Sequence, residues 1–127
     1  MIGRLNRKGT AAAEFALVIP VLLILIFGTL QAGVLFYANA GLKNGVGEAA
    51  RLATLWPRRT TGEITTQFRT MVYGIDRGAL ADPVITTGRS QGSDYVEITA
   101  TYTVPLDLFF VPLPSVTLTE RRRAFLP

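Results

Sequence analysis

A long apolar run near the N-terminus constrains this chain more than any other feature. Residues 10–39 read TAAAEFALVIPVLLILIFGTLQAGVLFYAN, and Glu14 is the one charged side chain among them. The 22 residues from Phe15 to Phe36 would span about 33 Å as an α-helix, which is roughly the thickness of a bilayer's hydrocarbon core. Residues 15–36 therefore predict a membrane-spanning helix.

The basic leader MIGRLNRKG, which precedes this run, predicts the orientation. Basic residues beside a membrane segment favour the cytoplasmic side, so we expect a cytoplasmic N-terminus and an extracytoplasmic C-terminal domain. The chain has 13 Lys and Arg against 9 Asp and Glu. Three of the basic residues lie in the leader, and residues 10–127 are nearly neutral. The net charge of +4 is therefore no argument for nucleic-acid binding.

Glu14 requires a partner or a function, because a carboxylate at the centre of a membrane costs about 2.5–3.5 kcal/mol. An ordinary secretory signal peptide has a shorter apolar core of about 7–15 residues, followed by a small-x-small cleavage site. Here no such site follows until the run has ended. A plain single-pass anchor explains the span and the basic flank, but it gives no reason for Glu14.

Gly9, Glu14 and the basic leader together resemble the type IV prepilin signature. In that signature cleavage follows the Gly, and the Glu becomes the fifth residue of the mature chain. Phe15 and the later segment NGVGEAARLA (residues 44–53) narrow the resemblance to the TadE-like family, small pseudopilins of tight-adherence (Flp) pili. The resemblance covers about the first 55 residues. Thr10 stands where the family more often has Ala.

The resemblance implies a function and a set of partners. A prepilin peptidase would cut between Gly9 and Thr10, and the mature subunit would wait in the bacterial inner membrane. During assembly Glu14 would neutralise the new ammonium group of Thr10 in a neighbouring subunit. The implied partners are other pilins and pseudopilins of the same pilus, the peptidase, the inner-membrane assembly platform and the lipid bilayer.

Within this class, a minor pilin or pseudopilin that assembles or initiates the pilus is favoured over a major pilin. The major subunits are little more than the helix, whereas about 70 residues follow Ala53 here. The C-terminal domain would lie in the periplasm, or outside the cell once in the pilus. The rival hypothesis is an unprocessed single-pass membrane anchor whose extracytoplasmic domain binds a partner.

We expect an α+β protein with three segments. These are a leader (residues 1–9), a long N-terminal helix (residues 10–55) and a small extracytoplasmic domain (residues 56–127). Pro20 should kink the helix without ending it. The expected helix-packing residues are Phe15, Pro20, Gly41, Gly45 and Ala49. The small residues among them recur every fourth position, so they would either let another helix approach closely or seat the protein's own domain.

The C-terminal domain should contain a second amphipathic helix and an antiparallel hairpin or three-stranded sheet. Thr60 and Glu63 have the form of a capping box, and the apolar spacing extends this helix to about Leu80. Residues 95–104 alternate apolar and polar, and residues 116–125 are rich in Thr and Val, so the two segments should pair as antiparallel strands. Residues 84–87 predict a short strand, and GRSQGSD a turn or loop. The second helix or the end of the first should cover the apolar face.

Two further segments each have two interpretations. The connection PLDLFFVPLP (residues 105–114), with Phe109 and Phe110, is unusually apolar for a loop. It either folds under the sheet or forms a tip that contacts a partner or lipid. The run of arginines at residues 121–123 either grips acidic lipid or another subunit, or protects an exposed strand edge against aggregation.

The sequence offers little catalytic chemistry. It contains no Cys and no His, which removes the commonest general base and metal ligand. Asp76, Asp82, Asp94 and Glu97 lack the spacing of a calcium loop. We therefore predict no catalytic residue, no metal and no cofactor, and an enzyme is the least supported class.

Overall fold

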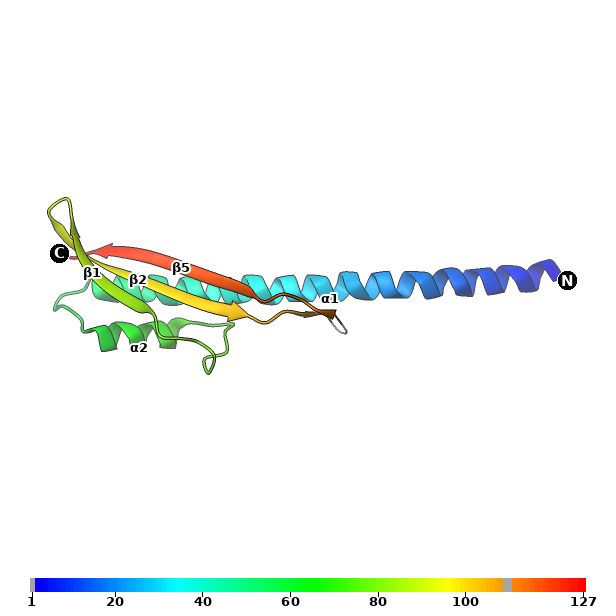
Figure 1. The fold of residues 1–127 in the computed structure, drawn as a ribbon, viewed down its shortest axis with the longest axis horizontal. Coiled ribbons are helices and arrows are strands. Elements are labelled where there is room, and N and C mark those ends of the chain that lie inside the picture. Colours follow the sequence, from blue (N-terminus) through cyan, green and yellow to red (C-terminus); the bar gives the residue numbers. More distant parts are fainter. Residues whose placement is uncertain (1, 109–110) are drawn as a thin grey trace.

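One helix dominates the architecture. The computed structural model describes residues 2–108 and 111–127. Helix α1 (Ile2–Ala53) forms a long shaft, and the other elements gather along its C-terminal part (Figure 1). They are α2 (Thr61–Met71), β1 (Val84–Ser90), β2 (Ser93–Val104), β3 (Asp107–Leu108), β4 (Val111–Pro112) and β5 (Val116–Phe125). The predicted α+β class is confirmed.

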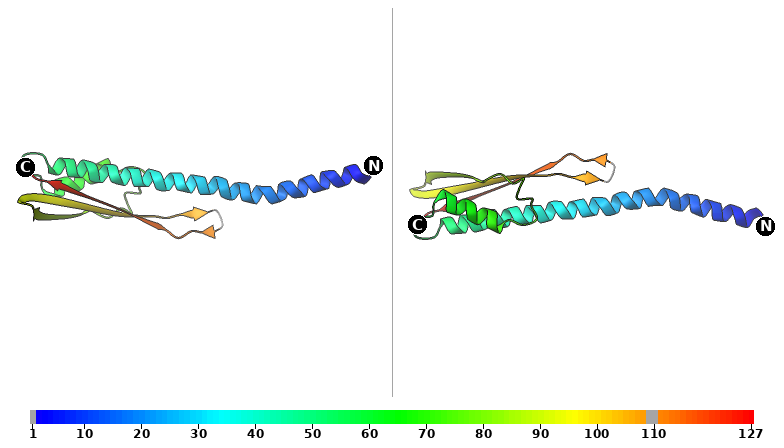
Figure 2. Two further views of the ribbon diagram at one scale, coloured as in Figure 1. Left: turned by 90° about the horizontal axis from the view of Figure 1, so that it is seen from above. Right: turned by 90° about the horizontal axis from the view of Figure 1, so that it is seen from below.

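The N-terminal half of α1 is exposed over the side chains that the structure describes there, residues 7–26. Side chains 7–26 are all exposed, and α1 is long and apolar enough to cross a membrane. The helix continues through Pro20, as predicted. Figure 2 shows a gentle bend in the blue N-terminal half of the helix, the part that contains this proline. A proline ring removes one helical hydrogen bond and displaces a carbonyl, which accounts for a bend.

The sheet is antiparallel with strand order β1-β2-β5. Strand β5 pairs along its whole length with β2, from Phe125 opposite Tyr95 to Val116 opposite Val104. This is the predicted hairpin across residues 105–114. On the other side β2 pairs with β1, which is longer than the predicted 84–87. The predicted loop GRSQGSD is mostly strand, because a two-residue turn at Gln91 and Gly92, both at positive φ, suffices to join the strands.

A single core lies where α1 meets the sheet and α2. Helix α1 packs against β2 and β5, and α2 runs beside it (Figure 1). The apolar side of β2 is buried as its alternation predicts, and so is one face of α1 beyond residue 37. The largest fully buried side chains are Phe68, Leu42, Ile98, Val46 and Val72. The end of the first helix is therefore the element that covers the apolar face of the sheet.

Helix α2 ends nine residues before the predicted Leu80. Val72 is extended (φ −70°, ψ 146°) and Gly74 has a positive φ of 66°. Val72 and Leu80 are nevertheless buried. The apolar spacing therefore predicts their burial correctly, but its prediction of a helical backbone is wrong. The tight turn at Gly74 places Tyr73 against Tyr37 of α1, with 5.3 Å between the ring centroids.

The small residues of α1 form the surface against which α2 and the segment directly after it pack. A Cβ atom at Gly41 would overlap the backbone of Tyr73, and one at Gly45 would overlap the Val72 side chain and lie 3.1 Å from the Phe68 carbonyl oxygen. Ala49 is fully buried. Of the two alternatives for this row, the structure shows the second, in which the row seats the protein's own domain.

Two alanine substitutions on α1 should have opposite effects on the domain. Gly41→Ala should lower its free energy of unfolding by about 1–3 kcal/mol or more, because the backbone of Tyr73 must move. Gly47→Ala should raise it by up to about 1 kcal/mol through helix propensity, since its Cβ would meet only the mobile end of Arg122 at 3.2 Å. Pulse proteolysis of the full chain in detergent across a urea series measures both. Equal effects would contradict the proposed seat.

The capping box of α2 should make the domain sensitive to acid. The Thr60 backbone N–H donates to Glu63 Oε2 (2.8 Å), and the Glu63 N–H donates to Thr60 Oγ1 (3.2 Å). The first of these bonds, with help from Arg59, holds the pKa of Glu63 below its ordinary value. Its stabilisation is therefore present above the ordinary glutamate pKa and is lost as the pH falls through the lowered one. We expect Glu63→Gln to destabilise the domain at neutral pH but less so in acid. A difference that is constant across the pH range would contradict this.

Candidate functional site: the N-terminal helix and its flanks

The leader junction lies on an exposed helix. Gly9, Thr10 and Glu14 all belong to α1, and a Cβ atom at Gly9 would meet nothing within 4 Å. Thr10 and Glu14 are four residues apart, so they share one face of the helix, separated by about 6 Å along its axis. A cut after Gly9 would thus create an ammonium group one turn below the carboxylate, on the same face.

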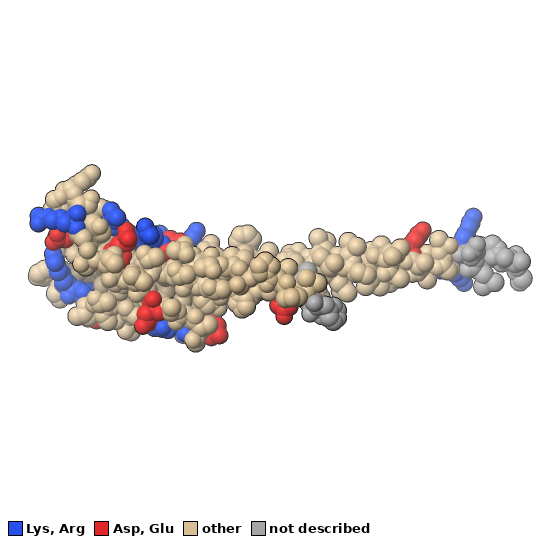
Figure 3. Space-filling model, viewed as in Figure 1, with Lys and Arg blue, Asp and Glu red and all other residues tan. Residues whose placement is uncertain are grey.

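Among the side chains that the structure describes, no salt bridge involves Glu14. The salt bridges that the structure shows, for the residues it describes, all join groups between Glu48 and Arg123. Figure 3 shows the same distribution, with charges gathered on the domain and near the N-terminal end of α1 and few along the shaft between them. The side chain of Glu14 is exposed, so its charge is available to a group from outside the chain.

The shaft around Glu14 is apolar on all sides. Its exposed large side chains include Phe15 (66% exposed), and Pro20 is exposed as well. The others are Leu17, Val18, Ile19, Val21, Leu22, Leu23, Ile24, Leu25, Ile26, Leu30, Val34 and Phe36. A helix that is apolar all round needs lipid or other helices about it.

The connection between β2 and β5 forms a projecting arm. Phe109 and Phe110 lie outside the described residues, but their flanks pair as the short strands β3 and β4, and we call these flanks, residues 105–108 and 111–114, the arm. The arm extends beyond the sheet and runs alongside α1 towards its N-terminus (Figures 1 and 2). Gln31 of α1 donates from Nε2 to the backbone oxygen of Asp107 at 2.6 Å. The flanks therefore do not fold under the sheet.

The arginines of β5 are largely engaged within the sheet. Arg123 lies 3.1 Å from the carboxylate of Glu97 and stacks over the Tyr95 ring at 4.1 Å, and Arg121 lies 3.8 Å from the same carboxylate. Since β5 is an edge strand, the arrangement fits protection of an exposed edge.

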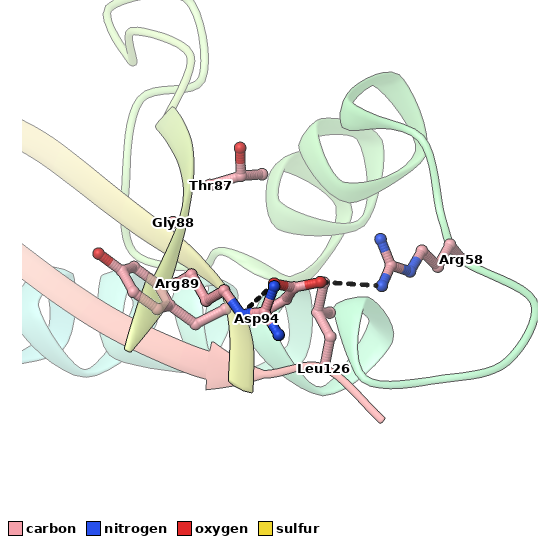
Figure 4. Close-up of a pocket in the computed structure, with 7 residues that line it drawn as sticks. Arg58, Thr87, Gly88, Arg89, Asp94 and Leu126 are labelled. Carbon is pink, nitrogen blue, oxygen red and sulfur yellow. Dashed lines mark hydrogen bonds and ion pairs between the residues drawn. The ribbon is translucent and has the colours of Figure 1, made fainter. Parts of the chain in front are cut away.

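A shallow open pocket lies at the end of the domain away from the N-terminus of α1. Figure 4 shows the residues that line it. Asp94 of β2 lies between Arg58, at 3.4 Å, and Arg89 of β1, at 3.9 Å. These residues come from separate segments, so sequence spacing gave no signal for them. Both arginines are exposed, and Asp94 is half-buried. Within the described part of the chain, no group of three or more acidic side chains is placed to hold a metal ion.

The geometry defines a protein with a membrane-capable N-terminal helix and a small domain seated on the same helix. A family model described as TadE-like protein matches residues 9–51, which is α1 from Gly9 almost to its end. The match confirms the resemblance to the TadE-like family, a structural family of tight-adherence pili, over residues 9–51. No curated protein and no solved structure matches the chain. Helix α2 and the sheet lie outside the matched segment.

Proposed function

We propose that this protein is a minor pilin or pseudopilin that acts in the assembly or initiation of a tight-adherence pilus. The observation that carries the proposal is the placement of Glu14. It is an exposed carboxylate on an otherwise apolar shaft, one helical turn from Thr10, and it forms no salt bridge among the described side chains. The TadE-like match over the same helix supports it.

The proposed role of Glu14 is electrostatic. A prepilin peptidase removes residues 1–9 on the cytoplasmic side and leaves an ammonium group at Thr10. When shafts leave the lipid and bundle, this group and the carboxylates of its neighbours lose their water together. Removing one member of such a buried pair typically costs about 3–5 kcal/mol, because the other charge is left uncompensated. Pairing with Glu14 therefore selects neighbours in a defined axial register.

The proposed minor role rests on the domain. Residues 56–127 supply α2 and all five strands, which is far more than a helix-only major subunit carries. Before assembly, the apolar shaft retains the protein in the inner membrane with its N-terminus in the cytoplasm and its domain outside. Other pilins, the peptidase and the assembly platform are its proposed partners.

The first test is cleavage after Gly9. We expect the mature protein from native membranes to begin at Thr10, and Gly9→Leu to block the cut while leaving membrane insertion intact. Gly28→Leu is the matched control, because the same change on the same helix also meets open space and should leave cleavage unaffected. Intact mass spectrometry of membrane extracts distinguishes the two forms. A wild-type chain that retains Met1 in cells containing the peptidase would overturn processing and favour the anchor.

The second test is the charge of Glu14. Glu14→Gln keeps the size of the side chain and removes its charge, so processing and membrane level should survive while pili and co-purified pilins are lost. Glu48→Gln is the control on the same helix: Glu48 forms only an exposed ion pair with Arg51, which contributes about 1 kcal/mol or less, and piliation should persist.

The single-pass anchor predicts the opposite result. An anchor gains from the loss of a charge in its apolar segment, so Glu14→Gln should be at least as abundant and as active as the parent. Normal piliation with this variant as the sole copy would exclude an assembly role for the carboxylate.

A further inference from the structure

We propose that the pocket at the distal end of the domain binds a carboxylated sugar unit of an acidic polysaccharide. The distal end is the end of the domain away from the N-terminus of α1 (Figure 1). Binding at this site goes beyond pilus assembly and involves neither Glu14 nor cleavage after Gly9. The tests of the pocket and of assembly can therefore fail separately.

The pocket forms where the segment after α1 meets the sheet (Figure 4). Its volume is about 450 Å³, within the range of about 300–1,000 Å³ that small-molecule sites occupy. The Leu126 N–H donates to the backbone oxygen of Asp94 at 2.8 Å, which fixes the end of β5 against β2. Its lining residues are Arg58, Thr87, Gly88, Arg89, Asp94, Tyr95 and Leu126.

The Tyr95 ring is held in place on several sides. A Cβ atom at Gly88 would overlap this ring, with the ring Cζ and the hydroxyl oxygen both at 2.5 Å, so the glycine is what lets the ring lie across β1. The Arg123 guanidinium lies 4.1 Å from the ring centroid, and the Phe125 ring packs edge-on at 6.0 Å. The aromatic part of the pocket lining is therefore preformed.

Two guanidinium groups and one carboxylate meet in the pocket. Arg58 Nη2 lies 3.4 Å from one oxygen of Asp94, and Arg89 Nε lies 3.9 Å from the other, so the net charge of the three is +1. Their side chains are 60%, 74% and 47% exposed in the order Arg58, Arg89, Asp94. Exposed pairs of this kind are weak, so a ligand displaces them at little cost. Each guanidinium has five N–H donors in a planar fork that matches a carboxylate.

Asp94 decides which class of anion fits. Because its carboxylate lies within 4 Å of both guanidinium groups, it repels a densely charged chain such as a sulfated polymer. It accepts hydrogen bonds from hydroxyl groups, and the Thr87 hydroxyl both donates and accepts. A uronic acid unit carries one carboxylate and several hydroxyl groups on one ring, so it matches the arginines and Asp94 together. An acidic peptide offers carboxylates without those hydroxyl groups.

An exposed aromatic side chain lies beside the pocket. Trp56 is 81% exposed and stands two residues before Arg58, so their Cα atoms are at most about 7 Å apart. The C–H face of a sugar ring is apolar and packs on such a surface. The pocket is shallow and open at the end of the domain, so a polymer chain can cross it without a free end.

Equilibrium dialysis of the full chain in detergent against a labelled oligogalacturonate tests the ligand class. The fully methyl-esterified oligomer is the matched control, because it keeps the rings and their hydroxyl groups but has no charge. We expect the acid to bind at least about tenfold more tightly, since the ester loses the charge-assisted hydrogen bonds. Polyglutamate of the same length should bind more weakly than the acid. Equal binding of acid and ester, binding of neither, or equal binding of polyglutamate would overturn the proposal.

Two arginines of similar exposure locate the site. Arg89→Gln removes a pocket guanidinium and should weaken oligogalacturonate binding by about tenfold. Arg121→Gln removes a β5 arginine that is 67% exposed and makes a similarly long contact, 3.8 Å to Glu97, and binding should be unchanged. Trp56 is the only tryptophan in the chain, so its emission should change as the sugar binds. Equal losses in both variants would show a diffuse effect of charge and overturn the site.

Asp94→Asn separates sugar recognition from plain charge. The variant keeps the shape of the side chain and leaves the two arginines without their carboxylate. Dextran sulfate should then bind more tightly than it binds the parent, and the preference for oligogalacturonate over dextran sulfate should fall. Dialysis of both polymers against parent and variant measures this preference. An unchanged preference would show that Asp94 does not select the ligand, and it would overturn the assignment to a carboxylated sugar.

Discussion

The close contact of α1 with α2 at Gly41 and Gly45 is the interaction on which the domain depends. Because neither position has a side chain, the backbone at Phe68 and Tyr73 reaches the surface of α1 directly. The domain has only 11 residues of second helix and one three-stranded sheet, which is little apolar surface for an independent core. It completes its core with α1, so the domain and the shaft form one body.

This sharing divides α1 into two parts with different surroundings. Its last turns are buried between α2 and the sheet, whereas the side chains of residues 7–26 are all exposed. Because one helix joins the two parts, the position of the membrane segment fixes the position of the domain, and the position of the domain fixes that of the segment. The arm fits this arrangement, since a bond between Gln31 and Asp107 holds the hairpin at a fixed height on the shaft.

Glu14 is the one residue that disagrees with its surroundings. Everything else in the shaft suits lipid, and a charge there opposes insertion. In the proposed filament, a pairing between subunits would resolve the disagreement, because the same residue would be unfavourable in lipid and favourable in a helix bundle. The apolar side chains around Phe15 would supply the packing of that bundle.

Where a pattern depends on neighbouring residues, the sequence predicted the structure well. The capping box at Thr60 and Glu63, the alternation in β2 and the bounds of β5 are all found as expected. The errors lie where periodicity does not specify the backbone. Val72 and Leu80 have helical spacing and are buried, yet both lie outside the helix, because Gly74 allows a positive φ that the spacing does not reveal.

The sequence by itself determined the apolar shaft and the position of Glu14 as a charge within it, because length, hydropathy and register along one helix are local properties. Only the tertiary structure decided which partner occupies the row Gly41, Gly45 and Ala49, and where residues 105–114 go. Both depend on contacts between segments far apart in the chain, such as Gly41 with Tyr73 and Gln31 with Asp107. Local spacing carries no information about which distant backbone fills a gap between small residues, so that choice is made by the packing of the whole core.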